Sequence, residues 1–306
     1  MKFFSAMRQK VSKNQNLSLH IMLVPAVIIV LIYNYGPMFG ISMAFQRFMP
    51  SEGFFNSPFV GLENFKYILQ MNDTMQVVWN TLFIAVMKII AGLLVPITFA
   101  LLMNEVRKNT VKRTIQTMIY LPHFLSWIIL SGVLIDILSP NNGMVNQFLG
   151  FFGIKPIFFL GNPQIFPFVM VATDVWKEFG YGTIIYMAAL SGVDPSLYEA
   201  AVVDGANRWQ QVFNVTLPSI RSTIVILTVL SLGNVLNAGF DQIFNLYSPM
   251  VYSSGDIIDT MVYRMGINDL LFSPAAAVGL FKSLVSFILI STSYYLAKRF
   301  ADYQIF

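Results

Sequence analysis

The sequence predicts an all-α membrane protein with six transmembrane helices. Of its 306 residues, 56% are hydrophobic and only 11% are charged, whereas soluble domains carry roughly 25% charged residues. The apolar residues gather into six runs, each near the length that a helix needs to cross a hydrocarbon layer of ~30 Å. Because lipid cannot satisfy exposed backbone groups, and these runs do not alternate as barrel strands do, we expect helices.

The expected spans are 17–36, 76–103, 116–138, 165–190, 220–237 and 275–297. Lys and Arg indicate their orientation, because these residues collect in short cytoplasmic loops. Twelve of the 19 basic residues fall on the side of both chain ends, and four on the opposite side. We therefore expect a cytoplasmic segment 1–16, a membrane domain 17–297 with a cytoplasmic loop at 191–219, and a cytoplasmic tail 298–306. The basic residues are spread over separate segments, so no nucleic-acid partner is expected.

The predicted cytoplasmic loop begins with the signals of a short helix. Asp194 and Pro195 are a good cap and first-turn pair, while Ser196 with Glu199 three residues later offers an alternative capping box. Gly205 can end this helix in a left-handed conformation, which costs glycine little. The pattern predicts one short helix that stops at a defined turn.

A second short helix is expected after this turn. Trp209 and Phe213 lie four residues apart, so a helix places both rings on one face, and Pro218 marks the start of the next span. Such an apolar face has two uses: it can lie on the bilayer surface, or it can fill a groove on a soluble partner.

The spacing within this loop favours the second use. The loop matches the pattern E-A-A-x3-G-x9-I-x-L-P through Glu199, Ala200, Ala201, Gly205, Val215, Leu217 and Pro218, with Val215 in place of the usual isoleucine. This pattern resembles the cytoplasmic signature of permease subunits of binding-protein-dependent ABC importers.

Other stretches resemble the carbohydrate-uptake branch of the same family, which includes maltose permeases and permeases for alginate and other polysaccharide fragments. They are VGLENF at 60–65, NTLFIA at 80–85, YLP at 120–122 and the passage 239–267. Within that passage LYSPMV stands where maltose-type permeases have a glycine-rich turn. This departure favours the polysaccharide-fragment permeases.

The resemblance implies a type I importer (MetI-like) fold and import of oligosaccharides across the cytoplasmic membrane of a bacterium. The implied partners are a second homologous permease, two copies of a cytoplasmic ATPase and an extracellular solute-binding protein. ATP and Mg are expected on that ATPase, and no cofactor on this chain. The residues implied in ATPase coupling are Glu199, Ala200, Ala201, Asp204, Gly205, Ala206, Trp209, Phe213, Leu217 and Pro218.

Catalytic chemistry is not expected in the chain itself. The fragment nearest to a P-loop, 279–283, lacks the G-x-x-x-x-G-K spacing and lies in a predicted span. The two histidines, His20 and His123, are far apart in sequence and have no cluster of partners, which disfavours a metal or acid–base site.

Charged residues inside a span are costly unless they face a partner or water. Asp174, Lys177 and Glu178 fall in the fourth expected span, at a spacing that predicts an internal Asp174–Lys177 pair with Glu178 beside it. This group is either a structural ion pair or the polar wall of a sugar pathway. In the second case Trp176 and Tyr181 supply aromatic faces for sugar rings.

A second polar group comprises Asn234 and Asn237 in the fifth expected span and Asp241 just beyond it. These side chains either hold helices together or contact substrate. Lys88, in the second span, either binds an acidic sugar or pairs with an acid.

Two alternatives to oligosaccharide import remain open at this point. An importer of another solute, such as glycerol phosphate, shares the coupling motif. A channel or secondary transporter uses intramembrane charges without an ATPase, and then residues 199–218 tolerate change. A membrane enzyme ranks third, because the sequence shows no convergent nucleophile, acid and metal ligands.

Overall fold

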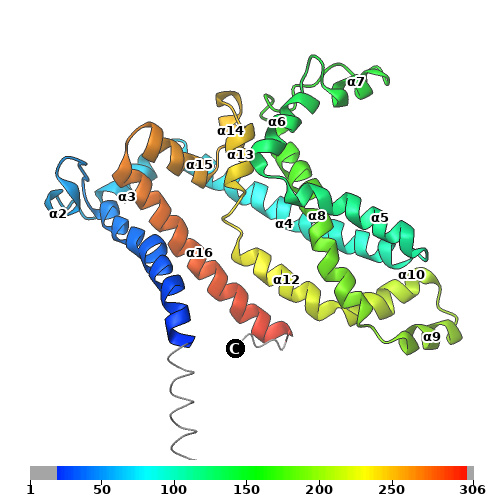
Figure 1. Ribbon diagram of the computed structural model, residues 1–306. Coiled ribbons are helices and arrows are strands. Elements are labelled where there is room, and N and C mark those ends of the chain that lie inside the picture. Colours follow the sequence, from blue (N-terminus) through cyan, green and yellow to red (C-terminus); the bar gives the residue numbers. More distant parts are fainter. Residues whose placement is uncertain (1–18, 302–306) are drawn as a thin grey trace, which may run out of the picture.

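The computed structural model describes residues 19–301, which are almost entirely helical (Figure 1). Within this range, extended pairing is limited to one isolated bridge between Gln46 and Phe59. The expected all-α class is confirmed for the part of the chain described. The expected cytoplasmic segment 1–16 and most of the tail 298–306 lie outside the described residues.

The first half of the chain forms a helical segment, Leu19–Phe45, followed by short helices and two long ones. The long segment includes η1 Leu31–Tyr35 and η2 Gly36–Phe45; then come α2 Gly53–Asn56, α3 Glu63–Gln70, α4 Thr74–Asn104, α5 Asn109–Tyr120, η3 Leu121–Phe124, α6 Trp127–Ile137, α7 Met144–Gly150 and α8 Phe166–Ser191.

The second half begins with the loop helices and ends with one long helix. Its elements are α9 Pro195–Val203, α10 Arg208–Gln211, η4 Val212–Thr216, α11 Leu217–Ser219, α12 Arg221–Gly233, α13 Phe240–Leu246, η5 Pro249–Val251, α14 Tyr252–Gly255, α15 Ile258–Tyr263, η6 Arg264–Asn268 and α16 Phe272–Ala301.

Three helices in the described range are long and apolar enough to cross a membrane, or up to five if each of two bent pairs is one span. The three are Leu19–Phe45, α4 and the Phe272–Tyr295 part of α16. Helix α8 matches the expected span 165–190 and has 26 residues, which is about 39 Å of helix. All six expected segments thus fall on helices, and the count of six spans stays a prediction.

The expected span 116–138 falls on two helices joined by a sharp bend. The helix that begins at Asn109 stops at Phe124, and α6 leaves it at an angle of 104°. Pro122 lacks a backbone N–H and Ser126 caps α6 by accepting a hydrogen bond from the Ile129 N–H. A new helix start inside an apolar run therefore produces the bend.

The expected span 220–237 is also shorter than predicted. Helix α12 ends at Gly233, and the chain runs without regular structure until Gly239, whose φ is +96°. At this angle a glycine avoids the strain that other residues carry, so the chain can turn into α13. The break lies next to α4, where it forms part of a polar cavity.

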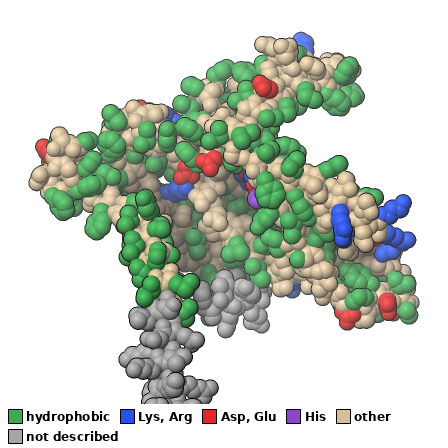
Figure 2. All heavy atoms as spheres, viewed as in Figure 1, with side chains coloured by type: hydrophobic (Ala, Val, Ile, Leu, Met, Phe, Trp, Pro, Cys, Tyr) green, Lys and Arg blue, Asp and Glu red, His purple; other side chains and the backbone are tan. Residues whose placement is uncertain are grey.

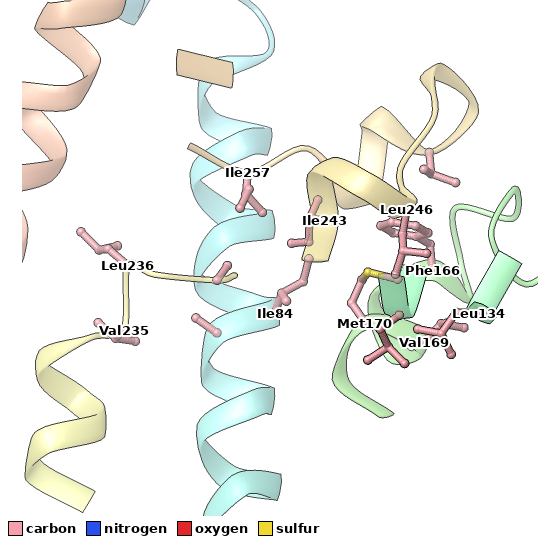
Figure 3. Packing of buried hydrophobic residues seen from close by; sticks show 14 residues of the cluster. Ile84, Leu134, Phe166, Val169, Met170, Val235, Leu236, Ile243, Leu246 and Ile257 are labelled. Atoms are coloured by element: carbon pink, nitrogen blue, oxygen red, sulfur yellow. The ribbon is translucent and has the colours of Figure 1, made fainter. Parts of the chain in front are cut away.

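The core is built around α4 and α8, which pack along each other in the middle of the molecule (Figure 1). Ile84 of α4 packs with Phe166 and Met170 of α8 and with Ile243 of α13 (Figure 3). A second buried cluster joins α3 and α4 to α15 and α16, and a third, around Tyr186, joins α4 and α8 to the start of α12.

The long helices and the loop helices enclose a hollow. Figure 1 shows α9, α10 and the described end of α16 toward the lower side, and α3, α7 and α13–α15 toward the upper side. Figure 2 shows the molecule hollowed between the helix Leu19–Phe45 and the side formed by α5 and α8, with acidic, basic and histidine side chains on the upper wall. Charged groups therefore gather where two walls of helices face each other (Figure 2).

Gly180 tests how tightly the end of α5, which leads into the bend at 121–126, is held against α8. A Cβ at Gly180 would lie 2.0 Å from the Ile119 carbonyl oxygen, which is backbone and cannot move aside. We expect Gly180→Val to lower the free energy of unfolding by about 1–3 kcal/mol or more through overpacking. The thermal unfolding midpoint of the detergent-purified protein measures this.

Gly132→Ala is the matched control, because no atom lies within 4 Å of a Cβ at that helical glycine. Its midpoint should equal or exceed that of the wild type, since alanine favours helix. Equal midpoints for Gly180→Val and the wild type would contradict the close packing of α8 on the bend.

Candidate functional sites

The first candidate site is the loop of α9–α11. Asp194 caps α9 by accepting a hydrogen bond from the Ser196 N–H at 2.9 Å, and Pro195 takes the first helical position. The first of the two expected helix starts is therefore the one found, and the alternative box at Ser196 is not. The bond from Ser196 to the carboxylate lowers the pKa of Asp194.

Gly205 ends α9 as expected. Its φ is +80°, the Ala206 N–H donates to the Ala201 carbonyl at 2.9 Å, and the Gly205 N–H donates to the Val202 carbonyl at 3.0 Å. These two bonds form a Schellman motif, which satisfies carbonyls that a helix end leaves without partners. The turn after α9 is therefore fixed by backbone geometry.

The second loop helix carries the two aromatic rings on one face, as expected. Asn207 and Gln210 form a reciprocal capping box, a signal readable in the sequence that the sequence analysis missed. The rings of Trp209 and Phe213 stack with centroids 6.5 Å apart. Their exposures are 74% and 61%, so an aromatic pair stands free on the surface of this chain.

A cleft of about 600 Å³ separates this loop from the end of α4, with Glu199 and Tyr198 in its wall. Arg208 bridges the two sides by an ion pair with Glu105 at 3.7 Å, and the Tyr198 hydroxyl lies 3.1 Å from that of Thr216. Each of the expected coupling residues is exposed or half-buried: Glu199, Ala200, Ala201, Asp204, Gly205, Ala206, Trp209, Phe213, Leu217 and Pro218.

The second candidate site is polar and lies at the break between α12 and α13. The buried ammonium group of Lys88 donates to the Asp174 carboxylate at 3.1 Å, to the Ala238 carbonyl at 2.8 Å and to the side-chain oxygen of Gln242. These three acceptors account for its three donors. Of the two expected roles of Lys88, pairing with an acid is the one found.

The expected Asp174–Lys177 pair is wrong. Asp174 pairs across to α4, because Lys88 is buried there and needs a counter-charge. Lys177 donates instead to Glu178 at 2.7 Å and to the His123 carbonyl at 3.0 Å. Lys177 thus donates to a carbonyl of the bend between α5 and α6. Nothing in the local sequence pattern predicted that this carbonyl would lie beside Lys177.

His123 joins this second ion cluster. Its Nδ1 lies 2.6 Å from the second oxygen of Glu178, and its ring stacks on Tyr181 with centroids 4.3 Å apart. Glu178 and Tyr181, both expected pathway residues, are thereby brought together, with about half of each side chain exposed. Trp176 is also half exposed on α8, but the described contacts place it in neither polar cluster.

Of the remaining pathway candidates, two line a cavity beside Lys88 and one does not. A cavity of about 290 Å³ is lined by Lys88, Asn234 and Asn237 together with Asp174 and Gly239. Asp241 is exposed in the first turn of α13 and does not line this cavity. Among the described residues no group of three or more His, Cys, Asp or Glu side chains is arranged to hold a metal ion.

Comparison with known proteins identifies the class. A family model described as binding-protein-dependent transport system inner membrane component matches residues 88–302. The chain belongs to this family, and it is a membrane transport subunit with a multi-helical permease fold. The expected family resemblance is confirmed.

Two relatives from Bacillus subtilis (strain 168) align with nearly the whole chain. Protein LplB is 40% identical over 94% of this chain and 91% of the relative. The polygalacturonan/rhamnogalacturonan transport system permease protein YteP is 39% identical over 94% of this chain and 90% of the relative.

Two solved structures share the fold. A bacterial ABC transporter involved in the import of the acidic polysaccharide alginate has a chain of TM-score 0.87 and 35% identity, with 96% of this chain and 99% of that chain covered. A bacterial alginate ABC transporter in complex with an alginate pentasaccharide-bound periplasmic protein gives a TM-score of 0.85 at 35% identity, over 94% of this chain and 96% of that chain.

Lys88 provides a test of the buried network. Lys88→Met leaves Asp174 without its cation and the Ala238 carbonyl without its donor, and we expect a loss of about 3 kcal/mol in the free energy of unfolding. Thermal unfolding of the purified protein in detergent measures this loss.

Adding Asp174→Asn to Lys88→Met removes the stranded charge and should recover part of the loss. A Lys88→Met variant as stable as the wild type, or a double variant less stable than the single one, would argue against the ion pair.

Proposed function

We propose that this chain is one permease subunit of an ATP-driven importer for oligosaccharides released from acidic polysaccharides, in the cytoplasmic membrane of a bacterium. The observation that carries the proposal is near full-length similarity to a polygalacturonan/rhamnogalacturonan transport system permease and to a chain of a transporter involved in the import of the acidic polysaccharide alginate.

The loop of α9–α11 is the proposed contact with a cytoplasmic ATPase. Its first helix is stopped by a backbone motif and its second exposes a stacked Trp209–Phe213 pair, and an aromatic anchor of this kind fits a groove on a soluble partner. ATP and Mg bind to that ATPase in the proposal. This chain contributes the docking surface and the walls of the sugar path.

Two ATPase copies, a second homologous permease and an extracellular binding protein complete the proposed importer. The hollow between the helix Leu19–Phe45 and the side of α5 and α8 is open toward the viewer in Figure 2, and a second permease would supply the wall that closes it. ATP binding would favour one of two states of the pair by differential contacts at the loops, which shifts the population between inward and outward openings.

Replacement of Gly205 tests the docking loop. No atom lies within 4 Å of a Cβ at Gly205, so the valine side chain meets no clash, but valine is poorly tolerated at φ +80°. We therefore expect Gly205→Val to distort the turn after α9 at a cost of about 1–2 kcal/mol. Affinity purification of the tagged chain in mild detergent, with partners identified by mass spectrometry, should show loss of the ATPase.

Gly205→Asn is the matched control, because asparagine tolerates a left-handed conformation. It should retain the ATPase, and the second permease should co-purify with every variant. If Gly205→Val retains as much ATPase as Gly205→Asn, the loop is not the docking site.

Uptake measurements test the substrate class. Cells lacking this chain should lose accumulation of labelled oligogalacturonides or alginate oligomers, and should keep accumulation of maltodextrins and glycerol phosphate. Loss of glycerol phosphate uptake alone would support the other solute class, and unchanged uptake of every sugar would refute the carbohydrate proposal.

A further inference from the structure

A second, larger cavity adjoins the polar one. It has a volume of about 700 Å³ and lies between α13, α15, η6 and α16. This volume falls within the range of small-molecule binding sites. Asn237 lines both cavities, so the two adjoin at that side chain.

An ion pair forms the polar wall of the larger cavity. The Lys282 ammonium group, on α16, donates to the Asp259 carboxylate at 2.5 Å and to the Asn237 side-chain oxygen at 2.9 Å. Lys282 and Asp259 are 15% and 26% exposed, so they are largely removed from solvent. The ammonium group has three donors, and these two partners leave one for a ligand.

Two aromatic rings form the apolar wall. Phe240 and Tyr263 both line the cavity, and their centroids lie 5.7 Å apart with the rings tilted by 46°. Gly279 of α16 also lines the cavity, and no atom lies within 4 Å of the place its Cβ would occupy. The cavity thus combines aromatic faces, a charged donor and open space.

We propose that this cavity is a second sugar subsite, in which Lys282 donates its remaining hydrogen bond to a hydroxyl or carboxylate edge of an oligosaccharide. A sugar residue presents an apolar C–H face edged by polar groups, which matches a wall of Phe240 and Tyr263 beside Lys282. The inference rests on the proposed function, since it places additional sugar units of the same oligosaccharide in this cavity.

The position of Asn237 sets the order of the subsites. One sugar residue occupies the cavity beside Lys88, whose three ammonium donors are already used. The oligosaccharide then continues past Asn237 to Lys282. Lys282, and not Lys88, is therefore the cation that meets substrate. Contacts of Lys282 then matter only for oligosaccharides long enough to reach both cavities.

The test measures transport against chain length. The complete importer, reconstituted in proteoliposomes with its binding protein, is given uronate oligomers of two to five residues, and the maximal uptake rate is compared between the wild type and Lys282→Met/Asp259→Leu. The double change removes both charges, so neither remains without a partner. We expect uptake of the longest oligomers to fall about tenfold, and uptake of the dimer to change less than twofold.

Arg47→Met is the control, because the Arg47–Glu63 pair is exposed and lies outside both cavities. The ratio of its uptake rate for the longest oligomers to that for the dimer should equal the wild-type ratio. An equal fall at every length in Lys282→Met/Asp259→Leu, or no fall at all, overturns the subsite. If the wild-type importer takes up no oligomer of any length, the proposed function itself fails.

Discussion

The polar architecture of this chain depends on one constraint: a helix broken within a membrane-spanning region needs partners for its freed backbone groups. Helix α12 stops at Gly233, and the connection to α13 leaves the Ala238 carbonyl beside α4. The Lys88 ammonium group donates to this carbonyl. Asp174 balances its charge, and Asp174 and the side-chain oxygen of Gln242 accept its other two hydrogen bonds. Gln242 in turn donates to the Met170 carbonyl and to Thr173, so α4, α8 and α13 are joined at one point.

This junction accounts for the shape of the polar cavities. Because Gly239 approaches the Lys88 ammonium group so closely that a Cβ would lie 2.7 Å from it, the break is held directly against α4. The asparagines of the break then face open space, and Asn237 connects that space with the ion pair of Lys282. The bend between α5 and α6 is fixed in the same manner, with Lys177 donating to the His123 carbonyl. In both places a lysine donates to a carbonyl of irregular backbone.

Local signals in the sequence predicted the loop of α9–α11 well. Capping by Asp194, the left-handed turn at Gly205 and the shared face of Trp209 and Phe213 depend on residues at most five positions apart. The ion pairs were not predictable in this way, because their partners come from different helices. Lys88 and Asp174 are 86 positions apart, and spacing within α8 favoured Lys177 as the partner of Asp174. The pair of Asp259 and Lys282, from α15 and α16, was not predicted for the same reason.

Transport by the purified assembly would show directly whether this chain couples ATP hydrolysis by a partner to sugar entry. Uptake of a labelled uronate oligosaccharide would be measured in proteoliposomes that contain the complex isolated through this chain, with and without ATP on the side of α9 and α10. If the chain is an importer subunit, we expect uptake only with ATP on that side and the loaded binding protein on the other. Uptake by this chain alone, without ATP, would contradict it and identify a channel or secondary transporter instead.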